Sequence, residues 1–320
     1  MKAKIVGLGF YAPPRVVHAS EIAGSVGWCA QRIIESSRVV NRHWADEPWE
    51  ALAVKAARDA IGRGPPPDLI INASTTPRQC IPDGSVFLQR ELGYSGIAGH
   101  TVHASCLSFL VALHTAAQFV STGLYRRILI VSAEVASVSL NFAEPESAIL
   151  FGDGAAAAVI ERSPPDEASQ ILAYEFRTWP EGADLTELRG GGTRCHPNSP
   201  LTLHQDNLFH MDGPAVFKIA RKRLIQITSQ LHKKTGIQPE EIDLVVPHQA
   251  SGPALDVLTR LGYPKDRIVE ILSDYGNCIA ASIPMALAIA DREGRLKRGD
   301  SVLLIGSGAG LAIAGLILRW

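Results

Sequence analysis

The sequence predicts an α/β protein made of two copies of one β/α unit, and three observations lead to this prediction. Strand-like runs alternate with helix-like segments, which indicates parallel sheets covered by helices. Four pairs of segments match each other, in the same order, in the two halves of the chain. The chain is also long and apolar enough, with 320 residues and 46% hydrophobic side chains, to bury one large shared core.

The first matching pair has the pattern of buried strands. DLIINAST (68–75) and DLVVPHQA (243–250) each place an acidic residue before a continuous apolar run. Such runs are typical of strands that are covered on both faces. Helix-like segments follow both of them, GSVFLQRELG (84–93) and GPALDVLTRLG (252–262).

The second half of each copy repeats in the same way. SCLSFLVALHTAA (105–117) and NCIAASIPMALAIA (277–290) both enter an apolar helix through small residues. The strand-like pair RILIVSAEV (127–135) and FGDGAAAAVIERS (151–163) corresponds to the closing segment 300–320. Two copies of one unit are therefore expected, with the two apolar helices buried between them.

We expect the halves to cover residues 1–165 and 166–320 and to share one core around a pseudo-twofold axis. The least regular stretch is 177–207. Its centre, RGGGTRCHPNSP, has three consecutive glycines, two prolines and several polar residues, which predict a loop. A loop of this length in a compact protein usually serves a site or is disordered. Residues 212–234 then predict an amphipathic helix with a basic outer face.

Charge and hydropathy argue against nucleic acid and membranes as partners. The chain has 31 basic and 32 acidic residues, so its net charge of −1 creates no field that would select either surface. The first residues, MKAKIVGLGFY, predict a β-strand and have none of the features of a signal peptide. The apolar runs are judged too short to cross a bilayer, which takes about 18 residues. We expect a cytoplasmic protein.

The cysteines and histidines predict a reduced protein without metal. The five cysteines are odd in number and none forms a C-x-x-C pair, which argues against disulfides and against a cysteine zinc site: Cys29, Cys80, Cys106, Cys195 and Cys278. The ten histidines are scattered, with no pair at the spacing of a helical metal site.

Three side chains are expected to converge at one end of the molecule, where the carboxyl ends of strands carry ligand-binding loops. Cys106 stands at the start of an apolar helix, whose positive end would favour a thiolate nucleophile; a small buried side chain is the alternative. His248 ends a buried strand, and a hydrogen-bonded core histidine is the alternative. Asn277 begins the equivalent helix, where it would otherwise serve as an N-cap.

Two glycine-rich turns lie in the same predicted region. Residues 152–154 and 306–310 would let backbone approach a ligand closely and donate N–H groups to an oxyanion. Glycine at a hairpin turn is the simpler explanation, and for residues 152–154 it is the favoured one.

Five motifs together resemble the β-ketoacyl-acyl-carrier-protein synthase III family of thiolase-fold condensing enzymes. They are ASC at Cys106, PHQAS at His248, YGNCIAASIP at Asn277, FGDGAAAAVI and GSGAGL, and they match in the family's order over nearly the whole chain. The resemblance implies a thiolase-like fold with five α-β-α-β-α layers. It also implies a homodimer with a long acyl tunnel.

The resemblance implies a decarboxylative Claisen condensation. Cys106 would carry the acyl group, while His248 and Asn277 would bind the malonyl thioester carbonyl and promote loss of CO₂. The backbone N–H groups of Cys106 and Gly308 would form the oxyanion hole. The acyl donor would be an acyl-CoA or an acyl-carrier protein, the second substrate malonyl-acyl-carrier protein, and no cofactor is implied beyond these thioesters.

Trp28 and Arg32 resemble the family's adenine-stacking tryptophan and phosphate-binding arginine. The family often has a further arginine about six residues before the phenylalanine of FGDG. Here that region, EPESAIL (144–150), has two acids and no arginine, which weakens the expectation of a CoA donor.

Lys218 matches the family's basic position for docking the carrier protein. Residues 251–253 read SGP where the family commonly has asparagine and then a basic residue. Ile81 falls at the acyl-pocket gate, where the family usually has phenylalanine. A smaller gate would admit a longer or branched acyl chain from the dimer partner's side.

Three alternatives remain open at this level. Arg189 and Arg194 flank the glycine run and would bind a carboxylate if the primer were dicarboxylic, as a glutaryl primer for pimelate and biotin synthesis would be; solvated arginines are the simpler reading. A relative that transfers the acyl group to an alcohol or amine, without decarboxylation, is disfavoured by Asn277. A non-catalytic partner subunit is disfavoured by the intact set of Cys106, His248 and Asn277.

Overall fold

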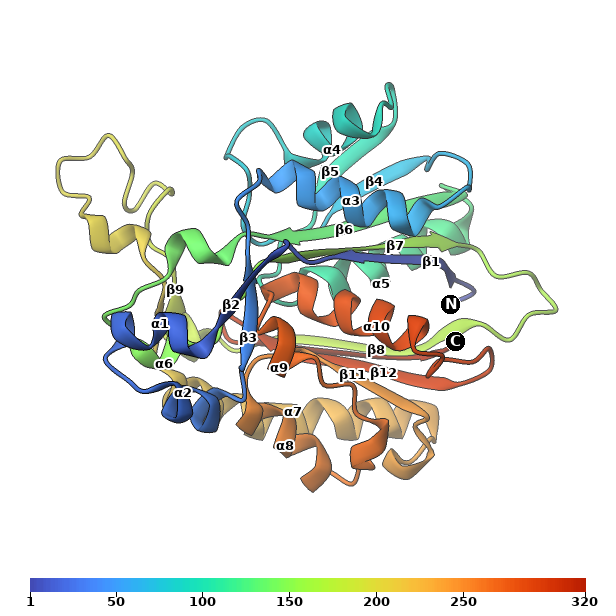
Figure 1. Cartoon of the computed structure of the whole chain (residues 1–320). Helices are drawn as coiled ribbons and strands as arrows, with labels where there is room; N and C mark the ends of the chain where they lie inside the picture. Colours follow the sequence, from blue (N-terminus) through green and yellow to red (C-terminus); the bar gives the residue numbers. More distant parts are fainter.

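The computed structural model describes all 320 residues and has five layers, α-β-α-β-α (Figure 1). The first sheet has the order β1-β7-β6-β4-β5 and the second the order β11-β12-β13-β8. Their strands are β1 (Lys4–Tyr11), β4 (Leu69–Asn72), β5 (Ala98–Thr101), β6 (Arg127–Glu134), β7 (Gly154–Glu161), β8 (Gln170–Thr178), β11 (Leu244–Pro247), β12 (Ser301–Gly308) and β13 (Ala312–Arg319).

Helices form the other three layers. The central layer is α5 (Ser108–Thr122) with α10 (Ser282–Arg292), which pack between the two sheets in one large core cluster. Helices α3 (Trp49–Ile61) and α4 (Gly84–Leu92) cover the outer face of the first sheet, and α7 (Gly213–Thr235) and α8 (Gly252–Arg260) cover the outer face of the second (Figure 1). The five-layered fold expected from the family resemblance is confirmed.

The strand β7 shows why the strands are continuous apolar runs. Its alternate residues Ala156, Ala158 and Ile160 face the central helices, whereas Ala155, Ala157 and Val159 pack with α3. Both faces of the strand are therefore buried, and no position is left for a polar side chain until Glu161.

The duplication is visible in the order of elements. The series β1-α3-β4-α4-α5-β6-β7 is repeated as β8-α7-β11-α8-α10-β12-β13. The expected boundary at residue 165 falls in the connection between β7 and β8. The sheets are mixed, however, and the expectation of parallel sheets was incomplete: β4 runs parallel to β5 and β6, but β7 runs antiparallel to β1 and β6.

The remaining elements lie at one end of the two sheets (Figure 1). They are β2 (Arg15–His18), β3 (Asn41–Trp44), α1 (Ala19–Val26), α2 (Ala30–Ser37), α6 (Pro145–Ala148), α9 (Leu272–Tyr275), β9 (Thr186–Glu187) and β10 (His210–Met211), with short 3-10 turns of which η6 is Ile279–Ala281. The predicted loop 177–207 protrudes from the body in yellow and has little regular structure.

One helix is long and apolar enough to cross a membrane by length and composition, so the sequence expectation that no run reaches this length was wrong. It is the window Ser105–Thr122, which includes α5, with a mean hydropathy of 1.3 and half of its residues buried. Because α5 lies between the two sheets, packing in the core accounts for its apolar character.

Candidate active site

Cys106 lies in the turn between β5 and α5, two residues before the helix begins. The residue keeps partial solvent access. Burial, reinforced by the charge of Glu134, raises the pKa of the Cys106 thiol to about 12, while the backbone N–H groups of Ala309 and Cys106 act in the opposite direction. The resting thiol is therefore protonated, because burial and Glu134 outweigh the expected effect of the positive end of α5. The same two N–H groups stabilise the anion when it forms.

The N–H group beside the Cys106 sulfur belongs to Ala309, one residue beyond the predicted Gly308. Gly308 ends β12 and packs against the cysteine turn: a Cβ built on it would lie 3.1 Å from Leu107 Cγ and 3.4 Å from Ala104 O. This close approach brings the next residue to the sulfur. The structure therefore favours Ala309 over Gly308 as the second donor to an oxyanion.

His248 follows the last residue of β11, and its backbone N–H donates to Ile305 O of β12 at 2.8 Å. Its side chain is buried, and Nδ1 has no hydrogen-bond partner in the protein. Burial lowers the pKa of His248 to about 4, so the imidazole is neutral at pH 7. A neutral imidazole carries one N–H, which it can donate to a carbonyl oxygen.

Asn277 lies in the loop between α9 and η6 and is buried. Its Oδ1 accepts the N–H of Ile279 at 2.9 Å, and its Nδ2 lies 3.4 Å from Ala250 O. These two partners identify which end of the side-chain amide is oxygen and which is nitrogen. One N–H of Nδ2 remains for a ligand. The N-cap alternative does not apply, because the N-cap position of α10 is Ala281.

The FGDG turn supports Asn277 from the other half of the chain. The N–H of Asn277 donates to Leu150 O at 2.8 Å, and Asn277 O accepts the N–H of Gly152 at 3.2 Å. A Cβ on Gly152 would lie 2.2 Å from Tyr275 O, so only glycine allows this approach. Beside it, the buried Asp153 carboxylate accepts N–H groups of Ala45 and Ser137. The FGDG segment thus supports the site. It connects α6 to β7, so the expectation of a glycine hairpin turn at residues 152–154 was wrong.

The end of β12 connects the three predicted catalytic residues. A Cβ on Gly306 would lie 2.7 Å from the Cβ of His248 and 3.2 Å from Leu107 Cδ2, next to Cys106. Ala309 faces the sulfur of Cys106, and Asn277 contacts Ala250, two residues after His248. Residues from three distant parts of the chain therefore meet around one strand end.

A pocket with an empty volume of about 450 Å³ lies between His248 and the helices α7 and α8. His248, Gly306 and Ser307 are among its lining residues, and the lining is mostly apolar. Cys106 and Asn277 are not among them.

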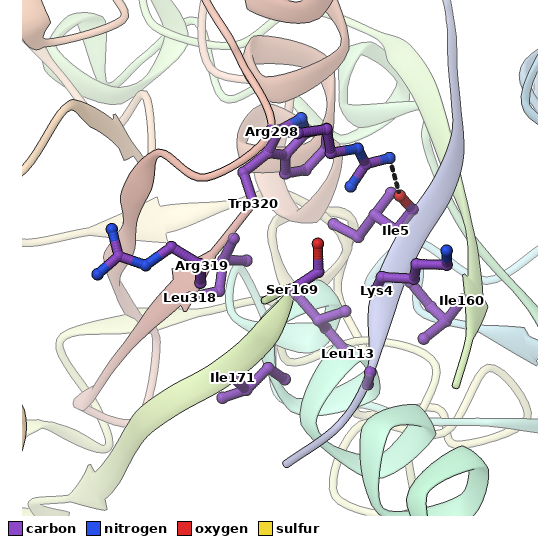
Figure 2. A pocket seen from close by; sticks show the side chains of 11 residues that line it. Lys4, Ile5, Leu113, Ile160, Ser169, Ile171, Arg298, Leu318, Arg319 and Trp320 are labelled. Carbon is purple, nitrogen blue, oxygen red and sulfur yellow. Dashed lines mark hydrogen bonds between the residues drawn. The ribbon is translucent and has the colours of Figure 1, made fainter. Parts of the chain in front are cut away.

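Figure 2 shows a second, smaller pocket, with an empty volume of about 290 Å³, where β1, the start of β8 and the end of the chain meet. Apolar side chains dominate its lining, and Arg298 donates to Ile5 O at 2.9 Å. None of Cys106, His248 and Asn277 lines it, which separates it from the candidate site.

The predicted substrate-binding residues lie at several places on the surface. The guanidinium of Arg32 stacks 3.9 Å above the ring centre of Trp28, so the two form one unit in the α1–α2 region. Lys218 is exposed on α7, one residue after Phe217 of the pocket wall. Ile81 is 84% exposed in the single chain. In the region that lacks the family's arginine, Glu144 accepts a hydrogen bond from His210 Nδ1 at 2.8 Å.

Arg189 and Arg194 have acidic partners in their own loop. Arg189 pairs with Asp206 at 3.1 Å and Arg194 with Glu187 at 3.3 Å. These pairs give the idea of an arginine site for a substrate carboxylate no support. No group of three His, Cys, Asp or Glu side chains is arranged as a metal site.

Sequence reasoning missed two residues of the site, Ala309 and Glu134. Glu134 ends β6, is fully buried, and has its pKa raised to about 7 by burial. Glu134 could have been noticed in the sequence because it ends the apolar run RILIVSAE. An acid buried at the end of such a strand requires hydrogen-bond donors around it.

Comparisons with known proteins find related sequences and similar structures. The model of 3-oxoacyl-[acyl-carrier-protein] synthase III matches residues 101–180, and the model of its C-terminal part matches residues 232–320. A β-ketoacyl-[acyl-carrier-protein] synthase III of Koribacter versatilis is 32% identical over 100% of this chain and 98% of its own length. The crystal structure of 3-oxoacyl-[acyl-carrier-protein] synthase III of Aquifex aeolicus superposes with a TM-score of 0.90 at 30% identity, covering 99% of this chain and 100% of that one. A priming β-ketosynthase of a polyketide pathway also has a TM-score of 0.90, at 28% identity, and covers 99% and 96% of the two chains.

Proposed function

The chain belongs to the 3-oxoacyl-[acyl-carrier-protein] synthase III family of condensing enzymes, and on this premise we propose that it joins an acyl thioester to malonyl-acyl-carrier protein with loss of CO₂. The product is a β-ketoacyl thioester. The observation that carries the proposal is the donor set: a neutral buried imidazole and an amide with its oxygen already bonded, next to a cysteine flanked by two N–H groups.

The first step is acyl transfer to Cys106. The sulfur attacks the thioester carbonyl, the N–H groups of Cys106 and Ala309 bind the oxyanion, and the C–S bond to the carrier breaks. The proton of the Cys106 thiol ends on the departing thiolate. The enzyme thiol and the carrier thioester are thus converted into an enzyme thioester and a carrier thiol. Such an exchange is nearly neutral in free energy.

The second step is decarboxylation and condensation. The malonyl C–C bond to the carboxylate breaks, CO₂ leaves, and the electron pair forms an enolate whose charge rests on the thioester oxygen. His248 and Asn277 each donate one N–H to that oxygen, and one such donor typically contributes about 2.7–4 kcal/mol. The carbanion attacks the acyl-Cys106 thioester and releases the thiolate of Cys106, which takes a proton from water to restore the resting thiol. Neither step changes the net oxidation state, so we propose no metal or redox cofactor.

We propose acyltransferase chemistry with an acyl-CoA or acyl-carrier donor, acting in the cytoplasm. The exposed Lys218 beside the pocket supports docking of an acidic carrier protein, and the Trp28–Arg32 stack supports recognition of a nucleotide. The region where the family often has an arginine carries the carboxylate of Glu144 instead, and this makes CoA the less favoured donor. A dicarboxylic primer is the weaker substrate proposal, since Arg189 and Arg194 are already paired.

A homodimer is proposed from an edge strand of the first sheet and from an exposed side chain. Strand β5 is one edge of the sheet, so one side of β5 has no strand partner in the single chain. Ile81 is an apolar side chain with 84% of its surface exposed, which a second chain would cover. In such a dimer Ile81 would be the expected gate at the partner's acyl tunnel.

Reconstitution tests the proposal against its two rivals. The chain is incubated with malonyl-carrier protein and a panel of acyl-CoA and acyl-carrier donors, including glutaryl, and CO₂ and products are measured. We expect CO₂ and a β-ketoacyl-carrier product in equal amounts, lost in Cys106→Ala. Acyl transfer to an added alcohol or amine without CO₂ would identify the transferase instead. No turnover and no acylation would identify a non-catalytic partner.

A further inference from the structure

Glu134 is a buried carboxylate that the proposed reaction does not use. It ends β6, is 0% exposed, and has no Lys or Arg partner. Its Oε1 accepts the N–H of Thr75 at 2.7 Å, and its Oε2 accepts the N–H and the hydroxyl of Thr76, both at 2.8 Å. The backbone N–H of Ala280 lies on the other side of the carboxylate, where η6 packs against β6. The hydrogen bonds from Thr75 and Thr76, with this N–H from the other half of the chain, stand in for the water that burial removes.

Ala280, which lies against the carboxylate, is separated from the proposed catalytic amide of Asn277 by two residues of backbone. Ala280 is in η6, and the residue before it, Ile279, donates its N–H to Asn277 Oδ1 at 2.9 Å. The φ of Ile279 is +47°, in the left-handed region that a β-branched residue avoids. Such a conformation persists only where the surroundings hold it. Here Asn277 holds one side of Ile279, and Glu134, through Ala280, holds the other.

We propose that Glu134 is a positioning residue that fixes η6 and thereby keeps the Nδ2 end of Asn277 directed at the substrate carbonyl. The inference rests on the proposed function, because it concerns the N–H that Asn277 donates there. Without the carboxylate, Ile279 relaxes toward negative φ and its N–H leaves Asn277 Oδ1. The amide is then free to turn, and its oxygen, facing the thioester oxygen, repels the developing charge instead of stabilising it.

The test separates the two half-reactions in Glu134→Gln, which keeps the shape of the side chain but replaces one acceptor oxygen by an N–H donor. We expect CO₂ release from malonyl-carrier protein to fall about tenfold or more, while acylation of Cys106 stays within about threefold of the wild type. The control Thr76→Val removes one donor from the same carboxylate but leaves η6 in place, and should keep both rates near those of the wild type.

A second variant distinguishes positioning from general loss of structure. Glycine adopts positive φ without cost, so adding Ile279→Gly to Glu134→Gln should restore part of the lost CO₂ release. Equal falls in both half-reactions, with no recovery in the double variant, would overturn the proposal. So would an unchanged CO₂ rate in Glu134→Gln.

A crystal structure of Glu134→Gln decides the matter independently of activity. We expect Ile279 to leave the left-handed region and the 2.9 Å bond to Asn277 Oδ1 to be lost. If both are retained, Glu134 does not position Asn277, even where the proposed condensation is confirmed. If the wild-type chain releases no CO₂, the proposed function fails, and this structure still tests Glu134.

Discussion

Gly306 of β12 lies so close to His248 that a Cβ on the glycine would stand 2.7 Å from the Cβ of the histidine. The same added atom would be 3.2 Å from Leu107 Cδ2 and 3.5 Å from Ile283 Cδ1. The backbone of β12 therefore forms the wall against which the imidazole is seated. The position of His248 depends on the absence of a side chain there.

Gly306→Ala should displace His248 and overpack the core. We expect a loss of about 1–3 kcal/mol in the free energy of unfolding, together with a fall in CO₂ release that exceeds any fall in Cys106 acylation. Urea unfolding and the two half-reaction assays measure these. Gly24→Ala is the matched control, because nothing lies within 4 Å of its added Cβ. Equal activity in the two variants would contradict the seating of His248 by Gly306.

Asn277→Asp tests the amide as a donor. The two side chains have the same shape, and an aspartate can still accept the N–H of Ile279, but it has no N–H for the substrate oxygen. CO₂ release should fall by a factor of about 10²–10³, the usual cost of losing one oxyanion donor. Acylation of Cys106, followed by intact mass, should change little. A variant that decarboxylates as the wild type does would remove Asn277 from the mechanism.

His248 should make folding sensitive to acid. Its pKa is lowered to about 4 in the folded chain, so the unfolded chain binds the proton more readily as the pH falls below about 6.5. Between pH 7 and pH 5, protonation of His248 in the unfolded chain lowers the free energy of unfolding by about 2 kcal/mol. The decrease stops below the pKa of the folded chain.

The comparison with His248→Gln isolates that contribution. The free energy of unfolding is measured in urea at pH 7 and at pH 5 for both proteins. The difference, variant minus wild type, should be about 2 kcal/mol larger at pH 5 than at pH 7. Because Glu134 and the other titrating groups are common to both proteins, their effects cancel in the difference. A difference that does not change with pH would mean that the imidazole is not buried as a neutral group.

Cys106 should behave as a protonated thiol in the resting enzyme. Since its pKa is raised to about 12, its rate of alkylation by iodoacetamide should keep rising about tenfold per pH unit through pH 10. Peptide mass mapping follows Cys106 separately from the exposed Cys29 and Cys80. A rate that levels off near pH 7 would indicate a thiolate at rest.

The fold could be predicted from the sequence because its pattern is repeated. The continuous apolar runs at 69–72 and 244–247 became the equivalent strands β4 and β11, and the apolar segments after Cys106 and Asn277 became the central helices α5 and α10. The antiparallel pairing of β7 with β1 and β6 was missed because an apolar run buried on both faces has the same pattern in either direction.

Within the site, the sequence predicted the types of residue better than it predicted their local geometry. His248 follows the end of its strand as expected, but Asn277 lies in the loop before η6 and not at the start of α10. The raised pKa of Cys106 was not expected, because burial and the charge of Glu134, which no local pattern shows, outweigh the helix end. The sequence also predicted Gly308, and not Ala309, as the second N–H donor to the oxyanion. Which of the two faces the sulfur depends on how closely β12 packs on Leu107, and these segments are about 200 positions apart in the sequence.

Intact-mass analysis of the acyl-enzyme tests the central claim most directly. The chain is mixed with acyl-CoA and acyl-carrier donors, its mass is recorded, and the modified peptide is sequenced before and after malonyl-carrier protein is added. We predict one acyl group per chain, attached to Cys106, absent in Cys106→Ala and discharged by the malonyl substrate. An unmodified Cys106 with every donor, or an acyl group that malonyl-carrier protein leaves in place, would contradict the account.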